Sequence, residues 1–186
     1  MGVDVWLLSE TKLTKAAHFE GYYIQQTTSS SKGGCVTLVD RSKIHRMKLM
    51  KTLGAYFNWT KVQLRDGADW IHLISCYLEG GEQTYQLERA QRISEVIKDI
   101  LRQDKHSTVI VGGDFNNHLP TVRSNLVQLG FEVAIADGQE THLLGNQLDQ
   151  VFIHNVTIRS AVVSNNYIRT LTDHKAIRVD VDLKMR

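Results

Sequence analysis

The sequence has little proline, little cysteine and no long hydrophobic run. One Pro among 186 residues excludes a proline-rich or collagen-like chain. Two Cys, with no C-x-x-C pair and no Cys/His cluster at zinc spacing, exclude a disulfide-stapled scaffold and a zinc finger. We expect buried free thiols at Cys35 and Cys76, and nothing in the sequence favours a disulfide between them. The apolar start at residues 5–8 is too short for a signal peptide or a membrane span.

The sequence also lacks a strong excess of either charge. Its 22 Lys and Arg against 20 Asp and Glu give a formal net charge of +2, which is compatible with an anionic partner but does not require one. An apolar content of 42% and a charged content of 23% are typical of a soluble globular protein. There is no internal repeat, and only residues 27–34 are low in complexity. We expect one domain over residues 1–186, intracellular and without membrane contact.

Hydrophobic periodicity predicts many strands and two helices. The clearer helix covers residues 84–102, where Leu87, Ala90, Ile97 and Leu101 recur at helical spacing, and a shorter one covers 122–129 and is closed by Gly130. Runs rich in β-branched and aromatic residues predict strands at 3–8, 22–26, 35–39, 44–49, 59–64, 70–77, 108–111, 151–153, 157–163 and 176–183. This mixture predicts an α/β protein with helices packed on a pair of sheets.

The stretch at residues 108–117, TVIVGGDFNN, links the predicted fold to possible chemistry. Four apolar residues form a short buried strand, and we expect Gly112 and Gly113 to end it. Asp114 and Asn116 then lie in the loop beyond the strand, where α/β proteins present reactive groups to a ligand. An Asx-rich turn would give the same residues, so this stretch alone does not establish a site.

Other polar residues also follow or begin predicted strands. They are Glu10, Tyr77, Thr141, His142, Asp149, Asp173 and His174. Each has a structural explanation when taken singly, for example a core tyrosine with its hydroxyl at the rim, or a turn at Asp173. Asp149 is the least ordinary, because a carboxylate that enters an apolar strand needs a partner. Taken together, however, four carboxylates and a histidine at strand ends are harder to explain as separate structural features.

Four segments, taken in order and with their spacing, resemble the endonuclease/exonuclease/phosphatase (EEP) superfamily. They are SETKL at 9–13, GDFN at 113–116, LDQVF at 148–152 and TDHKAI at 172–177. The chain is most similar to the endonuclease domain of non-LTR (LINE-type) retrotransposons, and also to AP endonucleases and DNase I. The resemblance implies a four-layer α/β sandwich, with two packed, mostly antiparallel sheets flanked by helices and a site across one end of the sheets.

The resemblance also implies a role for each residue at the strand ends. Glu10 and Asp173 would hold Mg²⁺, with Mn²⁺ as an alternative ion. Asp114 would activate the attacking water, Asn116 would hold that water or the phosphate, and Tyr77 would donate to the phosphate. His174, oriented by Asp149, would contact a phosphate oxygen. Residues expected to contact nucleic acid are Thr141, His142, Lys12 and Lys32, and a basic stripe would include Lys12, Lys32, Arg41 and Lys43.

The predicted function is therefore Mg²⁺-dependent phosphodiester hydrolysis, the nicking of DNA by a retrotransposon-type endonuclease domain, in the nucleus if the domain derives from a retrotransposon. Two alternatives stay open: a phosphatase of the same fold, and a catalytically impaired EEP-fold subunit with a binding or structural role. Relatives open with a strand that carries an Asn near the metal, and the present sequence begins after it. We expect another polypeptide or an upstream segment to supply that strand.

Overall fold

The structure is a computed structural model that describes residues 3–27, 33–65, 67, 69–81, 84–164 and 172–183. Its elements, in chain order, are β1 (Val5–Leu8), β2 (Tyr22–Gln26), β3 (Val36–Asp40), β4 (Ile44–Thr52), β5 (Phe57–Leu64), β6 (Trp70–Tyr77), α1 (Thr84–Gln103), β7 (Thr108–Asp114), the 3-10 turn η1 (Asn116–His118), α2 (Leu119–Gln128), β8 (Glu132–Val133), β9 (Asp149–His154), β10 (Val156–Ser164) and β11 (Ala176–Leu183). No helix in these ranges is long and apolar enough to cross a membrane.

The centre of the molecule is a six-stranded sheet in the order β4-β5-β6-β7-β9-β8. β6 and β7 are parallel and are joined through α1, whereas the other neighbours are antiparallel. The apolar side of α1, including Ala90, Ile93 and Ile97, packs with α2 against one face of this sheet and forms the larger core. The core therefore fixes β6, β7 and β9, and these three strands carry candidate site residues at one end.

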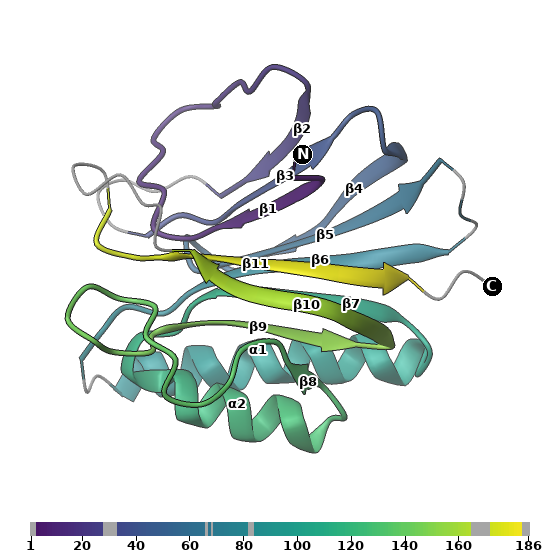
Figure 1. Cartoon of the computed structure of the whole chain (residues 1–186). Helices are drawn as coiled ribbons and strands as arrows, with labels where there is room; N and C mark the ends of the chain where they lie inside the picture. Colours follow the sequence, from purple (N-terminus) through teal and green to yellow (C-terminus); the bar gives the residue numbers. More distant parts are fainter. Residues whose placement is uncertain are drawn as a thin grey trace.

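Two smaller sheets cover the other face of the six-stranded sheet (Figure 1). One has the order β1-β3-β2 and the other is the hairpin β10-β11. Val5 and Leu7 of β1 and Leu183 of β11 pack against a second core of Val39, Ile44, Val62, Ile71 and Leu73. The predicted α/β sandwich of packed, mostly antiparallel sheets with helices is confirmed, and in the described ranges both helices lie on the six-stranded sheet (Figure 1).

The glycines after the apolar run 108–111 do not end the strand, contrary to our expectation. β7 continues through Gly112 and Gly113 to Asp114, whose Cα lies opposite Tyr77 on one side and Asp149 on the other. A Cβ on Gly113 would lie 2.0 Å from the carbonyl oxygen of Cys76, and one on Gly112 would lie 3.0 Å from a methyl group of Leu7. The two glycines thus permit close contact with neighbouring backbone and with the second sheet.

The other predicted elements are present with small changes at their ends. Both helices and the hairpin of β5 and β6 form as expected, and Gly130 adopts a φ of +85° just beyond α2. Cys35 and Cys76 are buried free thiols. Among the described strands, β1 is bonded only to β3 and β11 only to β10, so each has one edge without a strand neighbour.

Candidate active site

Asp114 and Asn116 form the centre of the candidate site. Asp114 is 3% exposed, and its Oδ1 accepts the Asn116 backbone N–H at 2.9 Å while its Oδ2 accepts the Asn116 Nδ2–H at 3.1 Å. Asn116 Nδ2 also donates to the Leu78 carbonyl at 2.8 Å, and Asn116 itself has a φ of +48°. A non-glycine residue in this left-handed conformation is strained and is held there by the surrounding contacts. The carboxylate therefore has a fixed orientation in a largely dry environment.

His174 lies two residues before β11, faces Asp114 and is oriented by Asp149. Its Nδ1 lies 2.8 Å from Asp149 Oδ2, and its Nε2 lies 3.9 Å from Asp114 Oδ2. The hydrogen bond to Asp149, reinforced by the charges of Asp149 and Asp114, raises the pKa of His174 to about 9. The ring is therefore an imidazolium at neutral pH, with Nδ1–H donating to Asp149 and Nε2–H available to a ligand.

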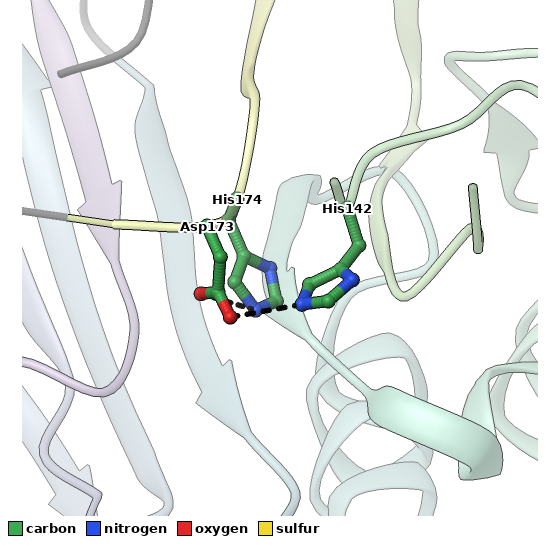
Figure 2. Close-up of side chains that lie close together, drawn as sticks. All are labelled: His142, Asp173 and His174. Carbon is green, nitrogen blue, oxygen red and sulfur yellow. Dashed lines mark hydrogen bonds and ion pairs between the residues drawn. The ribbon is translucent and has the colours of Figure 1, made fainter. Parts of the chain in front are cut away.

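Asp173 and His142 form a second contact beside this pair. Figure 2 shows the Asp173 carboxylate pointing toward the rings of both His142 and His174. His142 Nε2 lies 3.0 Å from Asp173 Oδ2, and the two imidazole rings meet edge to face with centroids 4.9 Å apart. The Leu144 backbone N–H donates to His142 Nδ1, so that nitrogen is an acceptor and neutral His142 carries its proton on Nε2. His142 is thus a hydrogen-bond donor that holds Asp173 and lowers the pKa of its carboxyl.

Glu10, two residues after β1, and Tyr77, the last residue of β6, complete the cluster. Burial, followed by the charges of Glu10 and Asp114, raises the pKa of the Tyr77 hydroxyl above its usual value, so this hydroxyl stays a donor. Glu10 Oε1 pairs with Lys12 Nζ at 3.1 Å. Both Glu10 and Lys12 have a positive φ, of +51° and +52°. The segment after β1 is therefore held in a strained conformation beside the tyrosine.

The negative charge of this cluster is only partly compensated. Burial, and then the charge of Asp149, raises the pKa of Asp114 to about 7, and Glu10 adds to the increase, although His174 opposes it. Two groups of side chains that share His174 have His nitrogen and carboxylate oxygen atoms within 4.8 Å of one another. One group is Asp114, Asp149 and His174, and the other is His142, Asp173 and His174. Because the charges of Asp149 and Glu10 raise the pKa of Asp114, a divalent cation bound here would relieve that repulsion, and the cluster therefore fits such an ion.

The structure brings most of the predicted site residues together at this end of the sheets. Thr141 is fully buried, and its hydroxyl accepts the backbone N–H groups of Leu148 and Asp149, so it positions Asp149 instead of facing a groove. Arg41 lies over the Tyr23 ring, and Lys43 Nζ is 4.0 Å from Asp4. Lys32 lies outside the described residues.

Sequence reasoning did not identify Gly33 and Gly34 as part of the site. Their carbonyls accept the backbone N–H groups of Lys12 and Thr11, at 2.8 and 3.1 Å, and a Cβ on Gly34 would lie 2.6 Å from Thr11 Oγ1. Both glycines have a positive φ, so they allow the strained segment around Glu10 to be clamped. The paired glycines at the end of the low-complexity stretch were the only available signal in the sequence.

Comparison with solved structures identifies the architecture. The chain resembles the endonuclease domain of TRAS1, a telomere-specific non-LTR retrotransposon, with 18% identity over 86% of this chain and 77% of that chain and a TM-score of 0.62. It resembles the human nocturnin catalytic domain with 17% identity, coverage of 96% and 80%, and a TM-score of 0.71. It also resembles the 3′ phosphatase NExo from Neisseria, bound to a product DNA hairpin, with 13% identity, coverage of 96% and 89%, and a TM-score of 0.73.

The chain has the EEP fold. The predicted resemblance is confirmed at this level, because these neighbours, together with an AP endonuclease from Archaeoglobus fulgidus, share that fold. No protein-family model and no curated protein matches the sequence. These neighbours include an endonuclease domain and a 3′ phosphatase, so the chemistry of their sites is a basis for a functional proposal.

Proposed function

We propose that the protein is a metal-dependent phosphodiesterase that nicks DNA. The observation that carries this proposal is the line of contacts from Asp149 through His174 to Asp114 and Asn116, in which a buried carboxylate and an imidazolium face each other across 3.9 Å. Phosphodiester hydrolysis needs a base for the attacking water and a positive group at the phosphate oxygens. Among the solved neighbours, the TRAS1 domain is an endonuclease domain and the 3′ phosphatase NExo is bound to a product DNA hairpin, and both support a nucleic-acid substrate.

The proposed roles follow from the protonation state of each group. Asp114, with a pKa raised to about 7, removes a proton from the attacking water near neutral pH. Asn116 keeps the Asp114 carboxylate in place through two hydrogen bonds. His174 donates its Nε2–H to a phosphate oxygen, since Nδ1–H is already engaged with Asp149. The Tyr77 hydroxyl, kept protonated by its surroundings, donates to the same phosphate.

Glu10 and Asp173 are the residues we propose to hold Mg²⁺ or Mn²⁺. Carboxylate oxygens are the ligands that these hard ions prefer, and magnesium is commonly held by one or two carboxylates together with waters. When bound, the ion would neutralise charge on the phosphate and stabilise the leaving oxygen. His142 would keep the Asp173 carboxylate turned toward the site through its Nε2–H.

The test is nicking of supercoiled plasmid by the purified chain, with Mg²⁺, with Mn²⁺ and with EDTA. We expect nicking only with a divalent ion, and loss of at least a hundredfold in rate for Asp114→Ala. Asp99→Ala, an exposed carboxylate on α1, is the matched control and should nick like the parent protein. Nicking in EDTA, or an active Asp114→Ala protein, would refute the mechanism. A folded chain without any hydrolysis would favour a catalytically impaired subunit.

A phosphatase of the same fold is the second candidate, because the neighbour with a TM-score of 0.73 is described as a 3′ phosphatase. The same residues would serve this reaction, since attack on a phosphomonoester uses the same base and phosphate contacts. Release of inorganic phosphate from a 3′-phosphorylated oligonucleotide, measured beside plasmid nicking, distinguishes the two. Faster release than nicking would assign the phosphatase.

We also propose that an additional strand pairs between β1 and β11. β1 packs on β6 and β7, β11 packs on β9, and β7 is the neighbour of β9, so β1 and β11, each bonded to one strand only among the described residues, lie over adjacent parts of one sheet. Unpaired strand edges bind extended segments readily. Hydrogen exchange of the β1 and β11 amides, measured alone and with an upstream segment or a candidate partner, tests this, and protection that does not change would contradict it.

A further inference from the structure

The positive charge of this protein is concentrated in one hairpin. Residues 41–65, which we call the basic hairpin, contain seven of the 22 Lys and Arg and none of the 20 Asp and Glu, so they carry +7 while the remaining chain carries −5. The basic residues are Arg41, Lys43, Arg46, Lys48, Lys51, Lys61 and Arg65. The small net charge of the whole chain therefore conceals a strongly positive surface.

Strand register places four of these cations on one face of β4 and β5. Arg46 lies opposite Gln63, Lys48 opposite Lys61, and Lys51 opposite Trp59. Met47 and Val62 point to the second core, so their neighbours Arg46, Lys48 and Lys61 point away from it. A register shift between Leu49 and Lys51 returns Lys51 to this same face.

Protection of a sheet edge does not account for this pattern. β4 is the edge strand of the six-stranded sheet, and lysines on an edge do prevent unwanted strand pairing. Lys61, however, is on β5, which is paired on both sides, and two lysines directly opposite each other are destabilising. In the described ranges, no carboxylate oxygen lies within 4.0 Å of Arg46, Lys48, Lys51 or Lys61. These cations thus have no acidic partner within the described chain, and a polyanion would relieve their repulsion.

Aromatic rings accompany the cations along the edge. An open groove of about 640 Å³ runs between β2 and β4, and its lining includes Tyr23, His45, Arg46, Lys48 and Trp70. Tyr23 is 45% exposed, and Arg41 lies over its ring at 4.9 Å. Cations with interleaved aromatic rings are typical of surfaces that bind a nucleic-acid backbone and stack its bases, whereas an acidic peptide would not need the rings.

The basic hairpin also leads to the candidate active site. The turn between β4 and β5 ends at Tyr56, whose carbonyl accepts the Tyr77 backbone N–H at 2.9 Å. Ala55 accepts the Gly34 backbone N–H at 2.8 Å, and Gly34 in turn binds the segment after Glu10. β4 has nine residues and therefore spans about 30 Å from this turn to the far end of the sheet.

We propose that the basic hairpin binds the phosphodiester backbone of nucleic acid that extends away from the scissile bond. This inference rests on the proposed function, because it places the reacting phosphate at the Asp114 end and the flanking backbone along β4. Strands of B-form DNA carry one phosphate per about 3.4 Å of axis, so β4 spans roughly eight phosphates. The contacts are to the backbone, so DNA and RNA duplexes of the same length bind the hairpin with similar dependence on salt.

The experiment compares two variants of the full chain with matched charge changes. Lys48→Gln/Lys51→Gln alters the basic hairpin, and Lys98→Gln/Lys105→Gln removes two exposed lysines on α1 and just after it. Affinity for a duplex of about 30 base pairs is measured in EDTA, from about 50 to 200 mM salt. Two lost phosphate contacts reduce the slope of log K against log salt by about 1.8, which makes the salt-induced loss of affinity about tenfold smaller than in the parent protein. The α1 variant should keep the parent slope.

Three further results distinguish the possible failures. The hairpin variant should retain the parent rate on a substrate of about six nucleotides and a melting temperature at least equal to the parent's, because Lys48→Gln removes a like-charge pair. Equal slopes for the two variants, or equally tight hairpin-dependent binding of polyglutamate, would overturn the inference. If binding depends on the basic hairpin as expected but the protein hydrolyses no substrate under any condition, the inference about the binding surface is retained and the proposed hydrolytic activity is rejected.

Discussion

Replacing Asp114 by Asn should stabilise the protein while abolishing hydrolysis. Asp114 is 3% exposed, and burial is the largest cause that raises its pKa from 3.8 to about 7. In the unfolded chain the carboxyl has its ordinary pKa, so the native state binds the proton more tightly than the unfolded state does. An ionised Asp114 therefore destabilises the folded protein, and a neutral amide in its place removes that penalty.

The size of the effect follows from the shift. About three pKa units, at 1.36 kcal/mol each, make the penalty about 4 kcal/mol above pH 7. The amide forfeits one of the two contacts with Asn116, because its NH₂ meets the Asn116 NH₂, and this costs about 1 kcal/mol. Below pH 4 the carboxyl is protonated in both states, so the penalty is absent there. The advantage of Asp114→Asn thus grows from pH 4 to pH 7 and reaches about 3 kcal/mol at pH 8.

The assay is thermal and urea unfolding of the two proteins in EDTA, from pH 4 to pH 8. At pH 8 we expect Asp114→Asn to melt about 6 to 12 °C above the parent, and at pH 4 to melt slightly below it. Asp99→Asn, with an exposed carboxylate on α1, should show no such pH dependence. A stability difference that is the same at every pH, or a less stable Asp114→Asn protein at pH 8, would show that the buried carboxylate carries no such penalty.

Three other predictions follow from single contacts. His142→Phe keeps an aromatic ring that packs on His174 but loses the Nε2–H donated to Asp173, so the affinity for Mn²⁺, measured by calorimetry, should fall 10- to 100-fold. His142→Gln can still donate a hydrogen bond and should lose much less affinity. Equal losses in the two variants would contradict the donor role of His142. Gly113→Ala places a Cβ 2.0 Å from the Cys76 carbonyl oxygen and should lower the free energy of unfolding by about 3 kcal/mol, as read from urea melts; an unchanged midpoint would refute the close contact. Burial raises the pKa of the Cys35 and Cys76 thiols, so neither thiol should react with a thiol reagent until the protein unfolds. Labelling of the folded protein as fast as that of an exposed free thiol would contradict this prediction.

Local sequence patterns determined most of the secondary structure and the identity of the candidate site residues. The spacing of Ala90, Ile93 and Ile97 specifies a helix with one buried side, and apolar runs such as residues 108–111 specify buried strands, because burial of one face depends on periods of 3.6 and 2. The motifs around Asp114 and His174 have a fixed order along the chain, so they could be identified without coordinates.

Only the tertiary structure decided how those residues act, because the deciding partners are far away in the sequence. The carbonyl of Cys76 explains why Gly113 continues a strand that local sequence predicted to end. The pairing of β4 with β5 sets Lys48 opposite Lys61, a consequence of register and of two bulges that no local pattern encodes. The Asp173 carboxylate approaches a histidine 31 residues away, and the Leu144 N–H selects the proton position on that ring. Local periodicity selects helices and strands, whereas charge, tautomer and close packing depend on neighbours that only the folded chain brings together.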